Sequence, residues 1–416
     1  MKRVSVLRRP QPVRAASGSS APTVRAVVAG AVGVVIAGLL AVAPPAAAAP
    51  SNKSWTISGD TTLTVRGHGY GHGHGMSQYG AEGAARQGLD YAEILDFYYP
   101  GTTLARSGGY LRIWLTEAGT GALVVRNADG LVLVDAGRAE GQRRIVLPAD
   151  RGGRWRILGD RVAYRDADGW HRFTTLKGQG SFGRSGQPIT LLTSDGSAAY
   201  RGRLTRIGTG SSAKVLDVVG MEAYVRGVVS REMPASWSPA AVQAQAVAAR
   251  TYAAFERADH TTASYDLCDT TSCQVYGGVA AEYVATDAAV EATAHRILTS
   301  GGEPAFTQFG SSSGGYTSAG SQSYLRAVAD PYDGWSGNPV HDWSTTITDR
   351  TLEAVRPAIG DLRTLRVDSR DGNGDWGGRV EQVTLIGSKG RASLSGDDLR
   401  SALGLRSTWF TFRVRK

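Results

Sequence analysis

Residues 110–220 alternate short apolar runs with polar positions, and Gly, Asp and Asn separate these runs at close spacing. An alternation of this kind, bounded by turn residues, predicts a succession of strands. In residues 239–257, by contrast, Ala, Val and Gln dominate without a Gly or Pro after Pro239, which predicts a helix capped by Ser238. Shorter helices are predicted at 286–295, 352–358 and 397–403, and further strands at 365–367, 379–385 and 409–412. The pattern predicts an α+β fold: a β-rich single large domain with a few helices.

The first 49 residues differ in kind from the rest of the chain. A basic stretch precedes an apolar run at 26–42, and an Ala-rich segment ends at Ala49. This layout predicts a secretory signal peptide with cleavage near Ala49, and a retained membrane anchor is the alternative. The segment 1–49 holds six basic and no acidic residues, so the formal net charge of +9 falls to +3 for the remainder. That balance does not indicate a nucleic-acid partner, and we expect contact with the membrane only transiently, through the signal segment.

The chain has two cysteines, Cys268 and Cys273, separated by four residues in a turn-like segment. In an oxidising compartment a local disulfide is the default for such a pair. A pair of free thiols and a metal site are the alternatives. Zinc normally needs four ligands from Cys, His or carboxylates, and the nearest upstream histidine is His260. We therefore expect a disulfide, with no metal and no cofactor.

Glu232 lies directly before the predicted helix, in a run that ends with Trp237. A carboxyl group beside apolar surface can keep its proton near neutral pH, because desolvation disfavours the charged form. Such a group suits a general acid that acts on a glycosidic oxygen. The alternative is a surface glutamate that caps a helix.

The run 228–237 resembles the acidic motif of the SpoIID/LytB family of cell-wall proteins. Further blocks resemble this family in the same order, and they lie at 200–202, 215–225, 268–276, 311–317, 324–328, 395–400 and 403–408. The resemblance also suggests a zinc site near the cysteines, but Ser272 stands where a histidine of the family is expected.

A Gly- and His-rich block at 67–104 usually closes the domain in this family, whereas here it precedes the other blocks. The resemblance therefore implies a circular permutation, which close domain termini make tolerable. A strand near 63–65 should then pair with the strand at 409–414. The implied division is a signal peptide at 1–49, a permuted Gly/His-rich segment at 50–105, a β-rich part at 106–200 and a SpoIID-like catalytic core at 201–416.

Candidate substrate-binding residues follow from the same blocks. His68, His72 and His74 invite a metal site, but the resemblance places only His72 at the histidine position of the family, so a polar loop that lines a groove is preferred. The serine loop at 311–315 lacks a nucleophile elbow, and it is interpreted as a groove loop rather than as a plain turn. The predicted substrate-binding residues are Arg250, His72, Ser77, Gln78, Ser311, Ser313 and Tyr316. For Arg250, a simple surface ion pair is an equal alternative.

The resemblance implies the cleavage of peptidoglycan glycan strands, in particular strands stripped of stem peptides, by a secreted or cell-wall protein. Hydrolytic glycosidases use two carboxylates across the scissile bond, and no second one is evident near Glu232. A lytic transglycosylase needs one, so the resemblance implies this reaction with Glu232 as acid and base. The alternatives are a glycan-binding module that stimulates an amidase and, less favoured, a metal-dependent peptidase or deacetylase.

Overall fold

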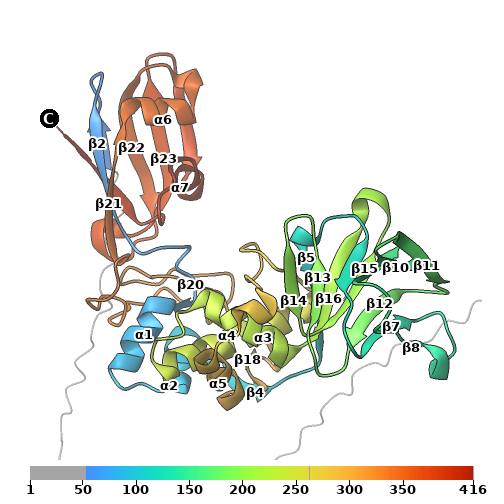
Figure 1. Ribbon diagram of the computed structural model, residues 1–416. Coiled ribbons are helices and arrows are strands. Elements are labelled where there is room, and N and C mark those ends of the chain that lie inside the picture. Colours follow the sequence, from blue (N-terminus) through green and yellow to red (C-terminus); the bar gives the residue numbers. More distant parts are fainter. Residues whose placement is uncertain (1–52, 262, 416) are drawn as a thin grey trace, which may run out of the picture. The chain divides into compact units, whose positions relative to one another are not determined.

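The computed structural model describes residues 53–261 and 263–415 (Figure 1). The predicted signal peptide at 1–49 lies outside these residues. None of the helices in the described ranges is both long and apolar enough to span a bilayer.

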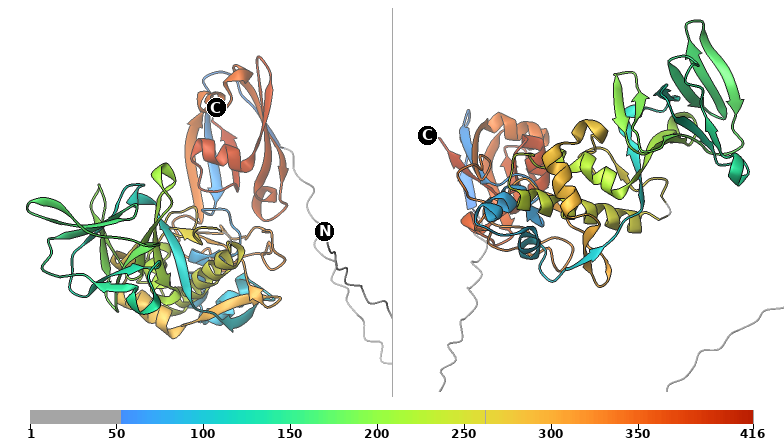
Figure 2. Two further views of the ribbon diagram at one scale, coloured as in Figure 1. Left: turned by 90° about the vertical axis from the view of Figure 1, so that its right-hand side faces the viewer. Right: turned by 60° about the horizontal axis from the view of Figure 1, so that its bottom comes forward.

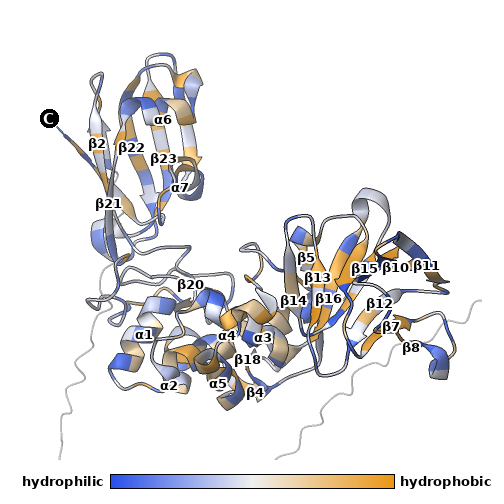
Figure 3. Ribbon diagram, viewed as in Figure 1, coloured by the Kyte–Doolittle hydropathy of each residue, from blue (hydrophilic) through white to orange (hydrophobic). Residues whose placement is uncertain are grey.

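Two antiparallel sheets occupy the region where strands were predicted. The seven-stranded sheet runs, in spatial order, through β17 (Leu267–Cys268), β5 (Tyr110–Leu115), β16 (Lys214–Gly220), β15 (Arg203–Ile207), β12 (Gly180–Arg184), β7 (Leu131–Asp135) and β8 (Arg144–Val146), with β17 parallel to β5. The six-stranded sheet runs through β11 (Gly169–Thr175), β10 (Arg161–Asp166), β9 (Arg154–Leu158), β6 (Leu123–Arg126), β13 (Ile189–Leu192) and β14 (Ser197–Tyr200). Alternate side chains of both sheets enter one core, as the period of two requires, and Figure 3 shows apolar residues along these strands.

Five helices pack together. They are α1 (Gln78–Arg86), α2 (Tyr91–Tyr98), α3 (Met221–Glu232), α4 (Pro239–Asp259) and α5 (Val284–Ala292). Helices α1, α2 and α4 contribute to a second core, whereas α3 and α5 bury their apolar side chains in the core of the two sheets. Helix α4 packs against all four others, because its many alanines let neighbouring backbones approach closely. Short strands connect these helices: β4 (Thr103–Arg106) with β18 (Arg296–Ser300) and β19 (Glu303–Pro304), and β3 (Met76–Ser77) parallel to β20 (Phe309–Gly310).

A third core lies between two further sheets and the helices α6 (Asp349–Val355) and α7 (Gly396–Leu403). One sheet holds β1 (Lys53–Thr56), β22 (Leu362–Arg370), β23 (Val380–Gly387) and β24 (Arg391–Ser395), and the other holds β21 (Asp342–Thr348), β2 (Thr62–His68) and β25 (Phe410–Val414). Strands β2 and β25 pair antiparallel, with Leu63 opposite Val414 and Val65 opposite Phe412 (Figure 2). The predicted pairing of these two distant segments is confirmed, whereas the permuted order stays a prediction.

Most predicted elements are present with shifted ends, but two helices and one cap differ from the prediction. Helix α3 was not predicted, and it places Glu222 on the same helix as Glu232. Helix α1 was also missed. The side chain of Ser238 makes no capping hydrogen bond; instead, the Ser238 N–H donates to a carboxylate oxygen of Glu82 at 2.8 Å.

Candidate functional site

Glu232 is the last residue of α3, and its carboxylate lies at a cavity of about 320 Å³. The cavity is lined by residues from five separate segments: His72, Glu232, Tyr252, Thr271, Ser272, Cys273, Gln274, Val275, Gln308 and Phe309. The His72 loop therefore lies at the same cavity as Glu232. Tyr252 and Phe309 are the aromatic residues of the lining, whereas Trp237 packs against Tyr79 with 4.9 Å between ring centroids.

Two hydrogen bonds hold the half-buried carboxylate of Glu232. The Gln78 side-chain amide donates to Oε2 at 3.3 Å, and the backbone N–H of Val275 is a second donor. Burial raises the pKa of Glu232 above its usual range, and these two hydrogen bonds reduce the rise without cancelling it. The environment thus favours the protonated carboxylic acid more than water does.

No other Asp or Glu among the described residues lines this cavity. Glu222 lies ten positions earlier on α3 and accepts a hydrogen bond from Arg250 at 2.8 Å. The Arg250 side chain is fully buried and also donates to the carbonyl of Arg296. Arg250 therefore does not hold Glu232, because its buried guanidinium is paired with Glu222. Its contact with substrate stays a prediction, which this burial disfavours.

His72 lines the cavity as a neutral imidazole. Burial lowers its pKa to about 4, because the charged form loses its hydration. Its Nδ1 accepts a hydrogen bond from the His74 N–H at 2.9 Å, and the ring also hydrogen-bonds the backbone of Phe309. Both ring nitrogens are thus engaged within the protein, which disfavours metal ligation.

The three histidines of the Gly-rich loop do not converge on one point. His72 and His74 stack with 5.0 Å between their rings, whereas His68 hydrogen-bonds Asp342 at 2.6 Å and stacks on Trp376. Within the ranges that the structure describes, no group of three His, Cys, Asp or Glu side chains is arranged to hold a metal ion.

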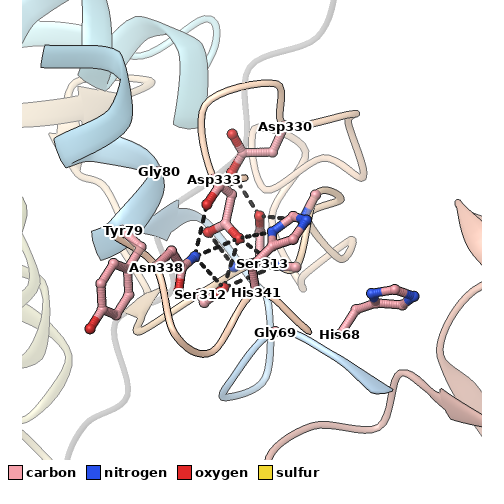
Figure 4. Close-up of polar contacts among 12 residues, drawn as sticks. His68, Gly69, Tyr79, Gly80, Ser312, Ser313, Asp330, Asp333, Asn338 and His341 are labelled. Atoms are coloured by element: carbon pink, nitrogen blue, oxygen red, sulfur yellow. Dashed lines mark hydrogen bonds and ion pairs between the residues drawn. The ribbon is translucent and has the colours of Figure 1, made fainter. Parts of the chain in front are cut away.

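Asp333 is the centre of a buried polar network beside this loop (Figure 4). Its carboxylate accepts hydrogen bonds from side chains of Ser77, Ser312, Asn338 and His341 and from the N–H groups of residues 313 and 314, at 2.6–3.1 Å. Burial alone would raise the pKa of Asp333, but the hydrogen bonds from His341, Ser77 and Ser312 outweigh it and hold the pKa below its usual value. The network therefore contains a buried charged carboxylate and ties the serine loop to the start of α1.

This network changes the interpretation of two predicted substrate ligands. Ser77 and Ser313 are 3% and 2% exposed, and their hydroxyls donate to Asp333 and Asp330 at 2.6 and 2.7 Å. Their substrate contacts stay predictions, which the burial and internal hydrogen bonds of both hydroxyls disfavour. Burial and the nearby Asp333 raise the pKa of Asp330 to about 6.

The other predicted ligands fall into two places. Gln78 contacts Glu232 as described. Ser311 is half-buried, and its carbonyl accepts the N–H of Tyr79 at 3.0 Å. Tyr316 lines a different, smaller cavity together with His68 and His341. The substrate contacts of Ser311 and Tyr316 stay predictions, but Tyr316 does not line the cavity of Glu232.

Sequence reasoning missed Tyr252, Gln308 and Phe309 as lining residues. Tyr252 lies in α4, Phe309 in β20 and Gln308 in the loop before β20, and no local sequence signal distinguishes any of them. The segment 271–275 lies within the block 268–276 that resembles the family, but the sequence did not predict that it lines the cavity. It does so because the loop brings the Val275 N–H to the Glu232 carboxylate.

Cys268 and Cys273 form a disulfide with a Cα–Cα distance of 5.5 Å, which confirms the predicted pairing. There is no free cysteine in the described part of the chain. The bridge closes the loop 268–273, and Cys273 itself lines the cavity of Glu232. The disulfide thus restrains the segment that leads to Val275, whose N–H donates to Glu232.

We expect the double variant Cys268→Ser/Cys273→Ser to have a free energy of unfolding lower by about 2 kcal/mol, because a short cross-linked loop restricts the unfolded chain by roughly that amount. Denaturant unfolding of both proteins, with and without reductant, measures the difference. Reductant should destabilise the wild type and leave the variant unchanged. Two titratable thiols in denatured, unreduced wild type would contradict the bond.

Comparison with known proteins finds similarity to one family in the part of the chain around Glu232. Residues 209–300 match the family model described as SpoIID, Stage II sporulation protein. The Amidase enhancer of Bacillus subtilis (strain 168) is 37% identical over 135 residues, which are 31% of this chain and 17% of that protein. Stage II sporulation protein D of the same organism is 30% identical over 219 residues, which are 47% of this chain and 61% of that protein. An uncharacterized protein of Brachyspira hyodysenteriae (strain ATCC 49526 / WA1) is 33% identical over 151 residues, 35% of this chain and 40% of that protein.

These matches agree with the predicted resemblance: the segment around Glu232 is similar to the SpoIID family. The chain spans less than two thirds of the length of each of these relatives.

Proposed function

We propose that this protein is an exported lytic transglycosylase that cleaves peptidoglycan glycan strands with Glu232 as its single acid and base. The observation that supports this most directly is the lone carboxylate of the cavity, whose raised pKa favours the protonated state. Hydrolysis by a carboxylate pair would need a second acidic group across the bond, and the lining supplies none. Location outside the cytoplasm is supported by the disulfide and by the predicted signal segment.

In this reaction the Glu232 carboxylic acid donates its proton to the glycosidic oxygen as the C1–O bond breaks. The resulting carboxylate then takes the proton of the muramic acid 6-hydroxyl, whose oxygen bonds to C1 and closes an anhydro ring. The proton is thus returned to Glu232, and no water is consumed. Gln78 and the Val275 N–H stabilise the carboxylate between the two steps, because both donate to it.

A second function is favoured by one observation, the similarity to a protein named Amidase enhancer. In that case the chain binds glycan and stimulates a separate amidase, and Glu232 has no catalytic role. Both proposed functions are compatible with a circular permutation. In that arrangement the Gly/His-rich segment 50–105 would complete the domain formed by residues 201–416. Pairing of β2 with β25 supports that arrangement.

Digestion of purified, amidase-treated peptidoglycan tests the two functions directly. The protein without residues 1–49 should release products with anhydro-muramic ends, which mass spectrometry separates from hydrolysed ends by the mass of one water. Release of hydrolysed ends alone would reject the transglycosylase. No release, together with faster cleavage by an added amidase, would favour the stimulating module.

The alkaline limb of the pH–rate profile should depend on Gln78. Glu232 must be protonated to act as the acid, so activity should fall as the pH rises through its pKa. Because the Gln78 amide stabilises the charged carboxylate, Gln78→Ala should move the alkaline limb of kcat/KM to higher pH. Gln308→Ala, which removes a different amide of the cavity, should leave the limb in place. An unshifted limb in Gln78→Ala would contradict the role of Glu232 as the acid.

A further inference from the structure

A second cavity, of about 600 Å³, lies on the seven-stranded sheet. It is lined by Tyr110, Val134, Arg144, Gly183, Arg184, Ser185, Arg201, Gly202, Arg203, Val218 and Gly220. The lining holds four arginines and no acidic residue. Three glycines contribute backbone without side chains, and a Cβ atom added at Gly220 would meet nothing within 4 Å. The cavity is therefore both open and positively charged.

Two of the four arginines are occupied by the protein itself. Arg201 makes two hydrogen bonds of 2.6 Å to the carboxylate of Glu282, and Arg184 donates to the carbonyl of Asp129 at 2.7 Å. Arg144 and Arg203 are exposed, and neither has an ion-pair partner within 4.0 Å among the residues that the structure describes. These two guanidinium groups are thus available to an anionic ligand.

The positive charge extends beyond the cavity to the whole strand-rich region. Residues 106–207 contain 17 Lys and Arg against nine Asp and Glu, a formal charge of +8, whereas residues 50–416 together carry only +3. The rest of the described chain is therefore net acidic. The small net charge of residues 50–416 therefore conceals a strongly basic region, residues 106–207, whose strands lie in the two large sheets.

We propose that the arginine cavity binds the repeating oxyanions, carboxylate or phosphodiester, of an anionic cell-wall polymer, at a site separate from Glu232. Guanidinium groups match both oxyanions through paired N–H donors. Tyr110, which is 72% exposed, adds an aromatic face with a polar tip at the same cavity. A nucleic-acid strand is disfavoured, because single-strand binders offer several aromatic side chains for successive bases and this lining offers one.

The cavity and the carboxylate are connected by one helix. Strand β16 ends at Gly220 in the cavity, and α3 then runs for 12 residues to Glu232. At 1.5 Å per residue, the helix separates the two sites by about 18 Å. A single extended polymer, or two neighbouring wall strands, can therefore occupy both sites at once.

The test is binding of fluorescently labelled protein without residues 1–49 to purified cell walls, in a Glu232→Gln background so that cleavage cannot change the ligand. Binding is measured for Arg144→Gln/Arg203→Gln and for the control Arg126→Gln/Arg161→Gln. The control removes the same two charges from exposed positions of the six-stranded sheet, outside both cavities. We expect the cavity pair to weaken binding about tenfold or more and the control pair less than twofold, because only the former loses charge-assisted hydrogen bonds.

Walls treated with hydrofluoric acid, which removes phosphodiester polymers, distinguish the two sources of oxyanion. Arginine-dependent binding that disappears after treatment assigns the site to phosphodiesters, and binding that persists assigns it to carboxylates of the peptidoglycan. Equal losses for the two arginine pairs would overturn the proposal, since they would show a general effect of net charge. Equally tight, cavity-dependent binding to a DNA duplex would overturn it as well. Neither result depends on whether Glu232 is catalytic.

Discussion

Glu232→Gln should lower the rate of anhydro-product release by about 10²–10⁴-fold, the usual contribution of a positioned acid–base group. The amide keeps the size of the side chain but cannot donate and regain a proton at the reacting oxygen. The variant should still bind glycan and unfold at the wild-type temperature, because burial favours a neutral group at this position. Product release measured by mass spectrometry, together with glycan binding, separates catalysis from binding.

Glu381→Gln is the matched control, since Glu381 is exposed on β23 and lines neither cavity. It should retain the wild-type rate. Wild-type release from Glu232→Gln would assign the catalytic role to another residue. If the protein instead stimulates an amidase without cleaving glycan itself, Glu232→Gln should leave the stimulation almost unchanged, so the variant distinguishes the two proposed functions.

Asp333→Ala should reduce the free energy of unfolding by about 3–5 kcal/mol, the range expected when one partner of a buried charged network is removed. Asp333 is fully buried, and its loss would leave donors from the serine loop, Asn338 and His341 without an acceptor. Denaturant unfolding measures the loss. Asp96→Ala, on the exposed face of α2, should change the stability by less than about 0.5 kcal/mol.

The effect of Asp333→Ala should also depend on pH. The pKa of Asp333 lies below its ordinary value of 3.8, so its contribution is present above that pH and is lost as the pH falls through the folded pKa. The hydrogen bond that His341 donates to Asp333 raises the pKa of His341 above 6.5, so the histidine contributes fully below 6.5 and less as the pH rises through its folded pKa. The difference between wild type and variant should therefore be largest between about pH 4 and 6.5. A difference that does not change with pH would contradict a charged Asp333–His341 pair.

Local sequence predicts much of this protein well. Alternation predicted the strands of both large sheets, and an uninterrupted run of helix-forming residues predicted α4. The short spacing of Cys268 and Cys273 predicted their disulfide. The sequence context of Glu232 was sufficient to identify it as the candidate acid.

Helices α1 and α3 could not be predicted in the same way, because their local propensities point elsewhere. Gly80 lies inside α1, and a side chain there would clash with the hydroxyl of Tyr98. Gly227 weakens the helical propensity of α3, and the neighbouring valines favour extended structure, but a Cβ atom at Gly227 would lie 2.5 Å from the ring of Tyr276. In both helices, close packing against distant residues outweighs the intrinsic cost of glycine.

What the sequence by itself determined is therefore the set of regular elements with strong periodicity, the disulfide and the candidate carboxylate. The tertiary structure alone decided which polar side chains are free to act. Gln78 contacts Glu232, whereas neighbouring Ser77 is buried against Asp333, although both belong to one short block. Likewise Arg250 is neutralised by Glu222, and Arg203 remains exposed. The physical reason is that the pKa and availability of a polar group depend on partners and burial supplied by segments far away in the chain, which local spacing does not encode.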